Sequence, residues 1–280
     1  MISRRAILAG IWPTLALTKT NGHVSAGLEI YSLRAQAEKD LPATLALIRR
    51  LGFREVEVSG LYGHSAAEFR RMLDYSGLKA TSMMAEYERL TQDCEAVAAD
   101  AHELGSEYVV CSTLPHQHKY LSVEDCDRAA PKLNLWGEKL ARAKLHLCYH
   151  THGTEFQKFE GGTVFDALAK RVDARWANFE MDIFWIVYGF QDPVTMLHRY
   201  AGRFPLMHIK DIRKGTVLGG LPADVREEDS VPLGQGIVDV AAALRAARET
   251  GVRHYYIEDE AVDAAAQLPA SLRYLQALDR

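Results

Sequence analysis

The 280-residue sequence lacks any apolar run approaching the roughly 20 residues that a membrane-spanning helix needs. Its cysteines are few and show no CxxC spacing, which argues against a cysteine-ligated zinc centre, and we predict structural roles for Cys94, Cys111, Cys126 and Cys148. A disulfide between Cys94 and Cys126 remains an alternative if the protein resides in an oxidising compartment. Beyond the N-terminus the chain also has no lysine- and arginine-rich block. With a formal net charge of -4, we predict no nucleic-acid partner.

The first residues resemble a targeting segment more than part of a fold. Ser3-Arg4-Arg5 precedes an apolar stretch from Ala6 to Leu17, and Val24-Ser25-Ala26 supplies small residues for cleavage. We therefore predict a twin-arginine-type signal peptide at residues 1–26, periplasmic or secreted localisation, and no membrane attachment after its removal. The alternatives are an amphipathic N-terminal helix or a chance pair of arginines.

The rest of the chain alternates β-rich runs with amphipathic stretches. Three of these stretches end at Gly52, Gly77 and Gly105, which suit a left-handed helix cap. The pattern predicts a single-domain α/β fold at 27–280, a (β/α)8 TIM barrel. A doubly wound open sheet has the same local pattern, but no glycine-rich phosphate turn follows the first strand. The predicted strands are Gly27–Ser32, Glu55–Ser59, Lys79–Met84, Tyr108–Ser112, His146–His150, Trp176–Asp182, Pro205–Lys210 and Tyr255–Glu258.

Polar residues end nearly every predicted strand. In a TIM barrel these ends meet at one mouth, where so many unpaired buried carboxylates would be costly. One divalent cation (Mn, Mg, Co or Zn) would offset their repulsion and suits a mixed set of carboxylates and imidazoles. Each residue taken alone has an ordinary structural alternative, such as helix capping by Asp211. The polar strand ends are Glu29, Glu57, His150, His152, Glu155, Glu180, Asp182, His208, Lys210, Asp211, Glu258, Asp259 and Glu260.

Other residues near these ends suit a carbohydrate ligand. Lys210 follows His208 by two residues, so it faces the same side of the strand and can neutralise an oxyanion or pair with a carboxylate. Trp185 and Phe156 lie just past candidate ligands, where they could wall a sugar ring or serve as loop packing. The loop Gly215–Ser230 is rich in glycine and charge, and we predict a lid.

Motifs along nearly the whole chain from Gly27 onward carry a family resemblance. The sequence resembles the sugar phosphate isomerase/epimerase family, also described as xylose isomerase-like TIM barrels. The motifs are Gly-Leu-Glu-Ile-Tyr-Ser-Leu-Arg (27–34), Tyr-His-Thr-His-Gly-Thr-Glu-Phe (149–156), Met-Asp-Ile-Phe-Trp (181–185), Gly-Arg-Phe-Pro-Leu-Met-His-Ile-Lys-Asp (202–211), Leu-Gly-Gln-Gly (233–236) and Tyr-Ile-Glu (256–258).

This resemblance implies a set of site residues. The metal ligands would be Glu155, Asp182, His208 and Glu258, with Glu155 and Glu258 also acting as an acid/base pair on opposite faces of the substrate. Substrate binding would fall to His150, His152, Lys210, Trp185, Glu57 and Phe156. The third strand departs from the pattern, because Met83-Met84-Ala85-Glu86 stands where many relatives place a histidine. The relatives' substrates therefore do not transfer.

Several functions follow from these expectations. The first is a metal-dependent isomerase or epimerase that moves a proton next to a carbonyl on a small-molecule carbohydrate: a sugar, keto-sugar or cyclitol. The second uses the same groups as a lyase or hydratase, by β-elimination from a 3-keto-glycoside. A non-catalytic carbohydrate-binding barrel and an abasic-site endonuclease are more distant alternatives. The residues leave open whether the barrel forms homo-oligomers.

Overall fold

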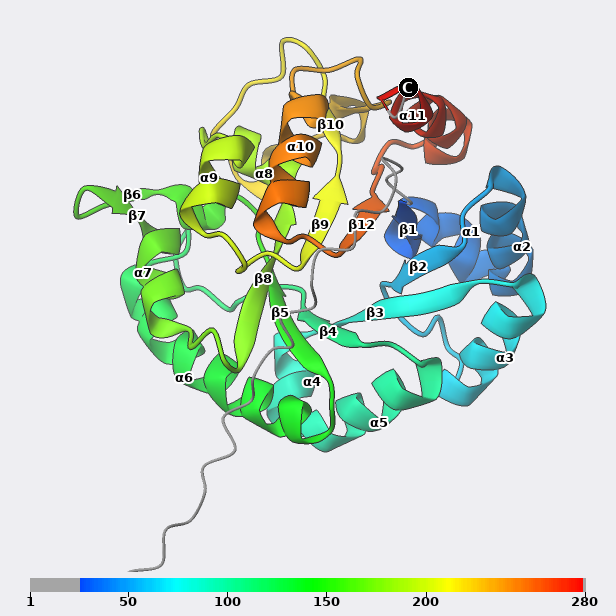
Figure 1. Cartoon of the computed structure of the whole chain (residues 1–280), viewed down its shortest axis with the longest axis horizontal. Helices are drawn as coiled ribbons and strands as arrows, with labels where there is room; N and C mark the ends of the chain where they lie inside the picture. Colours follow the sequence, from blue (N-terminus) through cyan, green and yellow to red (C-terminus); the bar gives the residue numbers. More distant parts are fainter. Residues whose placement is uncertain (1–25, 279–280) are drawn as a thin grey trace, which may run out of the picture.

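The computed structural model describes residues 26–278, in which eight parallel strands close into a barrel (Figure 1). The TIM-barrel prediction is therefore confirmed. The first strand is shorter than expected because Ile30–Leu33 forms a 3-10 helix, η1. All but the last residue of the predicted signal peptide lies outside the described residues. The barrel strands are β1 (Gly27–Glu29), β2 (Glu55–Val58), β3 (Lys79–Ala85), β4 (Tyr108–Cys111), β5 (His146–His150), β8 (Ala177–Asp182), β9 (Leu206–Ile209) and β12 (His254–Ile257).

Helices surround the barrel (Figure 1). The predicted helix ends are confirmed at Gly52, Gly77 and Gly105, whose φ angles of 113°, 69° and 77° are left-handed. The helices are α1 (Arg34–Lys39), α2 (Leu41–Leu51), α3 (Ala66–Ser76), α4 (Tyr87–Gln92), α5 (Cys94–Leu104), α6 (Val123–Arg142), α7 (Val164–Arg171), α8 (Ile183–Tyr188), α9 (Pro193–Arg199), α10 (Val240–Thr250) and α11 (Ala264–Leu278).

Short elements decorate the loops. Two antiparallel pairs form, β6 (Lys158–Phe159) with β7 (Gly162–Thr163) and β10 (Asp211–Ile212) with β11 (Ser230–Val231). The loops also contain three 3-10 helices in the described residues: η2 (Thr154–Phe156), η3 (Pro222–Asp224) and η4 (Glu227–Asp229). The predicted lid, Gly215–Ser230, therefore contains η3 and η4, and it joins two strands that pair with each other.

The barrel interior is packed rather than open. A small buried cluster separate from the main core consists of Tyr108, Val110, Cys148, Leu206 and Tyr256. The Tyr256 hydroxyl lies 2.6 Å from the Thr81 hydroxyl and accepts a hydrogen bond from Ser82 at 2.9 Å. Because this cluster fills the barrel, the space available to a ligand lies above it, toward the carboxyl ends of the strands.

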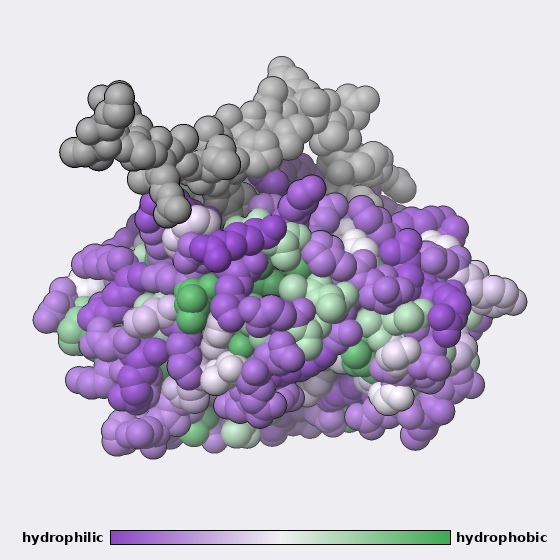
Figure 2. All heavy atoms as spheres, turned by 90° about the horizontal axis from the view of Figure 1, so that it is seen from below, coloured by the Kyte–Doolittle hydropathy of each residue, from purple (hydrophilic) through white to green (hydrophobic). Residues whose placement is uncertain are grey.

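The apolar residues lie mostly inside. The face shown in Figure 2 is largely hydrophilic, with apolar residues in small separate patches. All four cysteines are buried and free, as expected for the structural roles predicted for them. Within residues 26–278, no helix combines the length and apolar character that a membrane crossing requires.

Asp211 fixes the loop that leads from β9 to α10. It does not cap a helix; its buried carboxylate accepts backbone N–H bonds from Ile212, Gly234, Gly236 and Val238 at 2.8–3.0 Å. We expect Asp211→Ala to lower the free energy of unfolding by about 3 kcal/mol or more, because it leaves buried N–H groups unpaired. Urea unfolding measures this. Asp211→Asn keeps one acceptor oxygen, so its free energy of unfolding should lie between those of the parent protein and Asp211→Ala. A loss under about 1 kcal/mol in Asp211→Ala would contradict the role given to Asp211.

Candidate active site

Strand register brings the polar strand ends together. In β8 and β9, Asp182 lies opposite His208, and in β5 and β8, His150 lies opposite Glu180. Since side chains alternate along a strand, Glu180 and Asp182 share one face of β8 and lie at successive depths of the barrel. Glu258 directly follows β12, the neighbour of β9. The mouth thus gathers carboxylates and imidazoles from adjacent strands.

Three overlapping groups of described residues could hold a metal ion. They are His150–Asp182–His208, Glu29–His208–Glu258 and Glu57–Glu180–His208, each with ligand atoms within 4.8 Å of one another. His208 belongs to all three. The predicted ligands Asp182, His208 and Glu258 are therefore close together, and His150 stands with them.

The Nδ1 side of the His208 ring faces two carboxylates. Its Nδ1 lies 3.1 Å from Oε2 of Glu258 and 3.4 Å from Oε2 of Glu29. The Lys210 ammonium lies 3.4 Å from the same Glu258 oxygen and pairs with Glu260. Burial would raise the pKa of Glu258, but Lys210 and His208 hold it well below its ordinary value. Burial and the neighbouring Glu258 raise the pKa of Glu29 instead.

The inner side of His208 faces two more carboxylates. Nε2 lies 3.5 Å from Oε1 of Glu57 and 3.4 Å from Oε1 of Glu180, and both glutamates are fully buried. Burial and the charge of Glu180 raise the pKa of Glu57 to about 7. Burial alone would lower the pKa of His208, but the charges of Glu180 and Glu29 raise it well above its ordinary value. Glu57, predicted to bind substrate, therefore lies beneath His208 and does not line the cavity.

His150 is oriented by a carboxylate below it. Its Nδ1 donates to Oε2 of Glu180 at 2.9 Å, and its Nε2 lies 3.9 Å from Oδ2 of Asp182. Burial lowers the pKa of His150 to about 3, so the ring is neutral and Nε2 keeps its lone pair. A carboxylate behind a metal-binding histidine fixes its tautomer and ring orientation in this way. The geometry gives His150 the features of a ligand.

The chemistry of these groups fits a divalent cation. Asp182 uses Oδ1 to accept the N–H of Phe184 at 2.8 Å, and burial raises its pKa to about 8. Buried polar atoms without a hydrogen-bond partner are costly, and a cation would satisfy several of them at once. Among the described residues, such atoms at this site are Oε1 and Oε2 of Glu57, Oε1 of Glu180, Oδ2 of Asp182 and Nε2 of His208.

Glu155 lies apart from these groups. The Tyr149 hydroxyl donates to its Oε1, the backbone N–H of His152 lies 3.3 Å from it, and the Thr154 hydroxyl lies 3.3 Å from Oε2. Gly153, with φ of 84°, turns the chain into η2. Tyr149 precedes His150 and so points to the other side of β5, and the bond to Glu155 keeps that carboxylate with it. No metal-binding group of the described residues includes Glu155.

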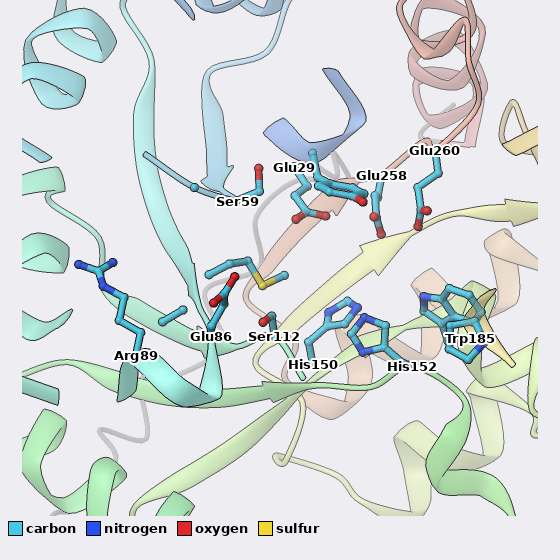
Figure 3. Close-up of a pocket in the computed structure, with 15 residues that line it drawn as sticks. Glu29, Ser59, Glu86, Arg89, Ser112, His150, His152, Trp185, Glu258 and Glu260 are labelled. Carbon is cyan, nitrogen blue, oxygen red and sulfur yellow. The ribbon is translucent and has the colours of Figure 1, made fainter. Parts of the chain in front are cut away.

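A cavity of about 610 Å³ opens above the cluster. His150 and His152 lie across it from Glu29 and Glu258, and Trp185 closes one end (Figure 3). Lys210 is buried, with Nζ 4.9 Å from the centre of the Phe184 ring and 5.4 Å from that of Trp185.

Two parts of the cavity wall differ from expectation. Phe156 does not line the cavity, because its ring packs against Gly189 and Phe165. Glu86 and Arg89 line the cavity, and Arg89 was not among the predicted site residues. Both lie where β3 leads into α4, a connection that the sequence marked only by the missing histidine at Met83-Met84-Ala85-Glu86. Only the knowledge that β3 ends at the mouth could have indicated them.

Comparison with known proteins identifies the family. The family described as xylose isomerase-like TIM barrel matches residues 45–278, and the chain belongs to it. A curated inosose dehydratase from Clostridium beijerinckii is 24% identical over 245 residues, covering 78% of this chain and 81% of its own.

Solved structures share the fold. A sugar phosphate isomerase/epimerase from Parabacteroides distasonis superposes with a TM-score of 0.76 at 24% identity, covering 93% of this chain and 96% of that one. The IOLI protein with a bound zinc atom superposes with a TM-score of 0.72 at 15% identity, covering 91% and 98%. The chain is thus a xylose isomerase-like TIM barrel. It is similar in sequence to a protein named inosose dehydratase and in fold to one named sugar phosphate isomerase/epimerase.

Proposed function

We propose that this protein is a divalent-metal-dependent lyase. It removes a proton next to a carbonyl of a keto-sugar or keto-cyclitol and expels the oxygen substituent on the following carbon, as water or an alcohol. The dehydratase activity named for the curated relative supports this reaction class.

One observation carries the choice of a lyase: Glu29 and Glu258, the two carboxylates that line the cavity and also lie in a potential metal-binding group, are on the same side of the cavity. Glu29 and Glu258 come from paired strands, β1 and β12, whereas the second expected base, Glu155, is held by Tyr149. Epimerisation by two carboxylates needs one on each face of the substrate. Elimination needs one base that can also return its proton to the leaving oxygen.

The residues that would hold the cation are His150, Asp182, His208 and Glu258. When bound, a divalent cation polarises the carbonyl and makes the neighbouring C–H more acidic. Glu29, Glu57 and Glu180 surround His208, and we assign them a positioning role. Lys210 keeps Glu258 ionised, because its ammonium lies 3.4 Å from Oε2.

Glu258 performs the proton transfer in this proposal. Its Oε2 faces His208 and Lys210, and the residue lines the cavity, so Oε1 is the oxygen that meets substrate. Oε1 takes the proton reversibly from the carbon next to the carbonyl and leaves an enolate. The electron pair of the enolate then forms a C=C bond as the C–O bond on the next carbon breaks. The leaving oxygen then takes the proton from Glu258, which ends ionised as it began. No further reactant is needed.

Incubation in D₂O tests this function. We expect the metal-loaded protein to release water or alcohol from a panel of keto-cyclitols and keto-glycosides and to place deuterium next to the carbonyl in recovered substrate. EDTA should abolish both reactions, and added metal should restore them. Absence of exchange and release across the panel would contradict the proposal.

A second candidate, an isomerase or epimerase, is favoured by one feature. His152 lies across the cavity from Glu258 (Figure 3), where an imidazole could exchange a proton with the opposite face of a substrate. The same incubation separates the two, because an isomerase conserves the mass of its substrate and a lyase does not.

A further inference from the structure

A second cavity lies beside the first. It has a volume of about 470 Å³ and shares two wall residues, His152 and Pro222, with the cavity above the cation site. Its remaining wall comes from the β4–α6 connection, from residues around the end of β5 and from the lid. These residues are Thr113, Leu114, His116, His118, Lys119, Tyr149, Thr154, Leu221 and Ala223.

The two cavities differ in chemistry. The first is lined by the carboxylates of Glu29, Glu86, Glu258 and Glu260, which suit the hydroxyl groups of a sugar. The second has no carboxylate in its wall, and Leu114, Leu221, Pro222 and Ala223 give it an apolar surface. Histidine, threonine, lysine and tyrosine side chains complete its wall. An apolar ring that covers the apolar part of this wall would be favoured by burial.

Hydrogen bonds tie the walls of the second cavity together. The Tyr120 hydroxyl, from the β4–α6 connection, donates to the carbonyl of Gly219 in the lid at 3.1 Å. The Tyr188 hydroxyl of α8 donates to the carbonyl of Leu221 at 3.4 Å. A Cβ on Gly219 would come within 2.3 Å of the Phe190 ring, so the lid packs closely there. These contacts hold the lid over the second cavity.

We propose that the substrate is a keto-glycoside with an apolar, ring-shaped aglycone, and that this aglycone occupies the second cavity. The inference rests on the proposed lyase function. A carbonyl at C3 of a hexose acidifies the C2–H bond and makes the oxygen at C1 the leaving group. The keto ring then lies at the cation site, and the C1–O bond points past His152 into the second cavity. Elimination gives an unsaturated keto-sugar and the aglycone alcohol.

Two synthetic substrates test the aglycone site: methyl and 4-nitrophenyl 3-keto-glucoside, which share the sugar. Because 4-nitrophenol is the better leaving group, KM and equilibrium binding are compared rather than kcat. We expect the 4-nitrophenyl compound to bind at least about tenfold more tightly, from burial of its ring. Equal binding of both compounds would overturn the proposal.

Substitutions in the lid test whether the preference for the 4-nitrophenyl compound depends on the second cavity. Leu221→Trp fills the cavity and Leu221→Ala removes part of its wall, so both should reduce the preference for the 4-nitrophenyl compound toward one. Val217→Trp, in the same loop but 85% exposed, should retain the preference. A preference that survives both Leu221 variants would also overturn the proposal.

The outcome separates this inference from the function on which it rests. Turnover of the methyl compound without a preference for the 4-nitrophenyl compound refutes the aglycone site and leaves the lyase standing. If neither compound reacts, the lyase fails, and calorimetric binding still decides the site. Tighter 4-nitrophenyl binding that Leu221→Trp abolishes supports it, and unchanged binding refutes it.

Discussion

Glu258→Gln is expected to lower kcat by roughly three to four orders of magnitude while the barrel stays folded, the upper range for loss of a general base. Glutamine keeps the shape of the side chain but cannot accept the proton from carbon. Glu258 also contacts both His208 and Lys210, so the substitution removes the negative charge beside these two groups. Lys210 keeps its pairing with Glu260, which limits the cost to stability.

Steady-state kinetics together with metal analysis test this prediction. Metal content shows whether the variant has lost its base alone or its cation as well. Glu227→Gln is the control, since Glu227 is an exposed carboxylate that pairs with Arg34 and lies outside both cavity walls; its kcat should match the parent protein. A kcat for Glu258→Gln within tenfold of the parent value would refute the role of Glu258.

Two substitutions at the end of β5 and in the segment after it should differ in their effect on metal binding. We expect His150→Ala to weaken divalent-metal binding by about a hundredfold or more, since it removes a ligand and leaves Glu180 without its partner. We expect Glu155→Gln to leave the metal Kd within about threefold, because Glu155 bonds to Tyr149 and the backbone of His152. Glu155→Gln should instead lower the free energy of unfolding by about 1 kcal/mol.

Competition titration with a chromogenic chelator measures both metal affinities, and urea unfolding measures the stability of Glu155→Gln. Both variants change one side chain within the same short segment, so each serves as the other's control. The reverse order, with Glu155→Gln losing the metal and His150→Ala keeping it, would show that the segment rearranges and that the ligand set inferred from the family motif is correct.

The barrel could be predicted from sequence because its signals are local. Glycines such as Gly52 and Gly105 end helices immediately before strands, and the alternation of the two repeats along the whole chain. The main local error was at Ile30–Leu33, where an apolar segment continues from the strand but winds into a 3-10 helix. Periodicity alone does not separate these outcomes for four residues.

The site was predictable only where a residue lies on a strand or directly after it. Asp182, His208 and Glu258 were expected as ligands from their places at strand ends and from the family resemblance. In the structure His208 lies in one potential metal-binding group with Asp182 and in another with Glu258. Glu155 follows β5 by five residues, and its direction depends on the turn at Gly153 and on the Tyr149 hydroxyl, neither of which strand periodicity describes. His150, the last residue of β5, was the better candidate by parity.

The depth at which a strand residue lies in the barrel could not be predicted from the sequence either. Glu57 was predicted at the mouth, but its carboxylate lies beneath His208 with no exposed surface. The sequence gives the face on which a strand residue lies but not its level, because the level depends on the stagger of strands around the barrel. The shift in pairing between Val56 and Glu57 against β3 is part of that stagger.

Diffraction recorded at the manganese absorption edge from crystals of the manganese-loaded protein would test the central claim most directly. We expect one strong anomalous peak at the barrel mouth, bonded to His150, Asp182, His208 and Glu258. A peak bonded to Glu155 without His150, or the absence of a peak in protein that remains fully active, would contradict it.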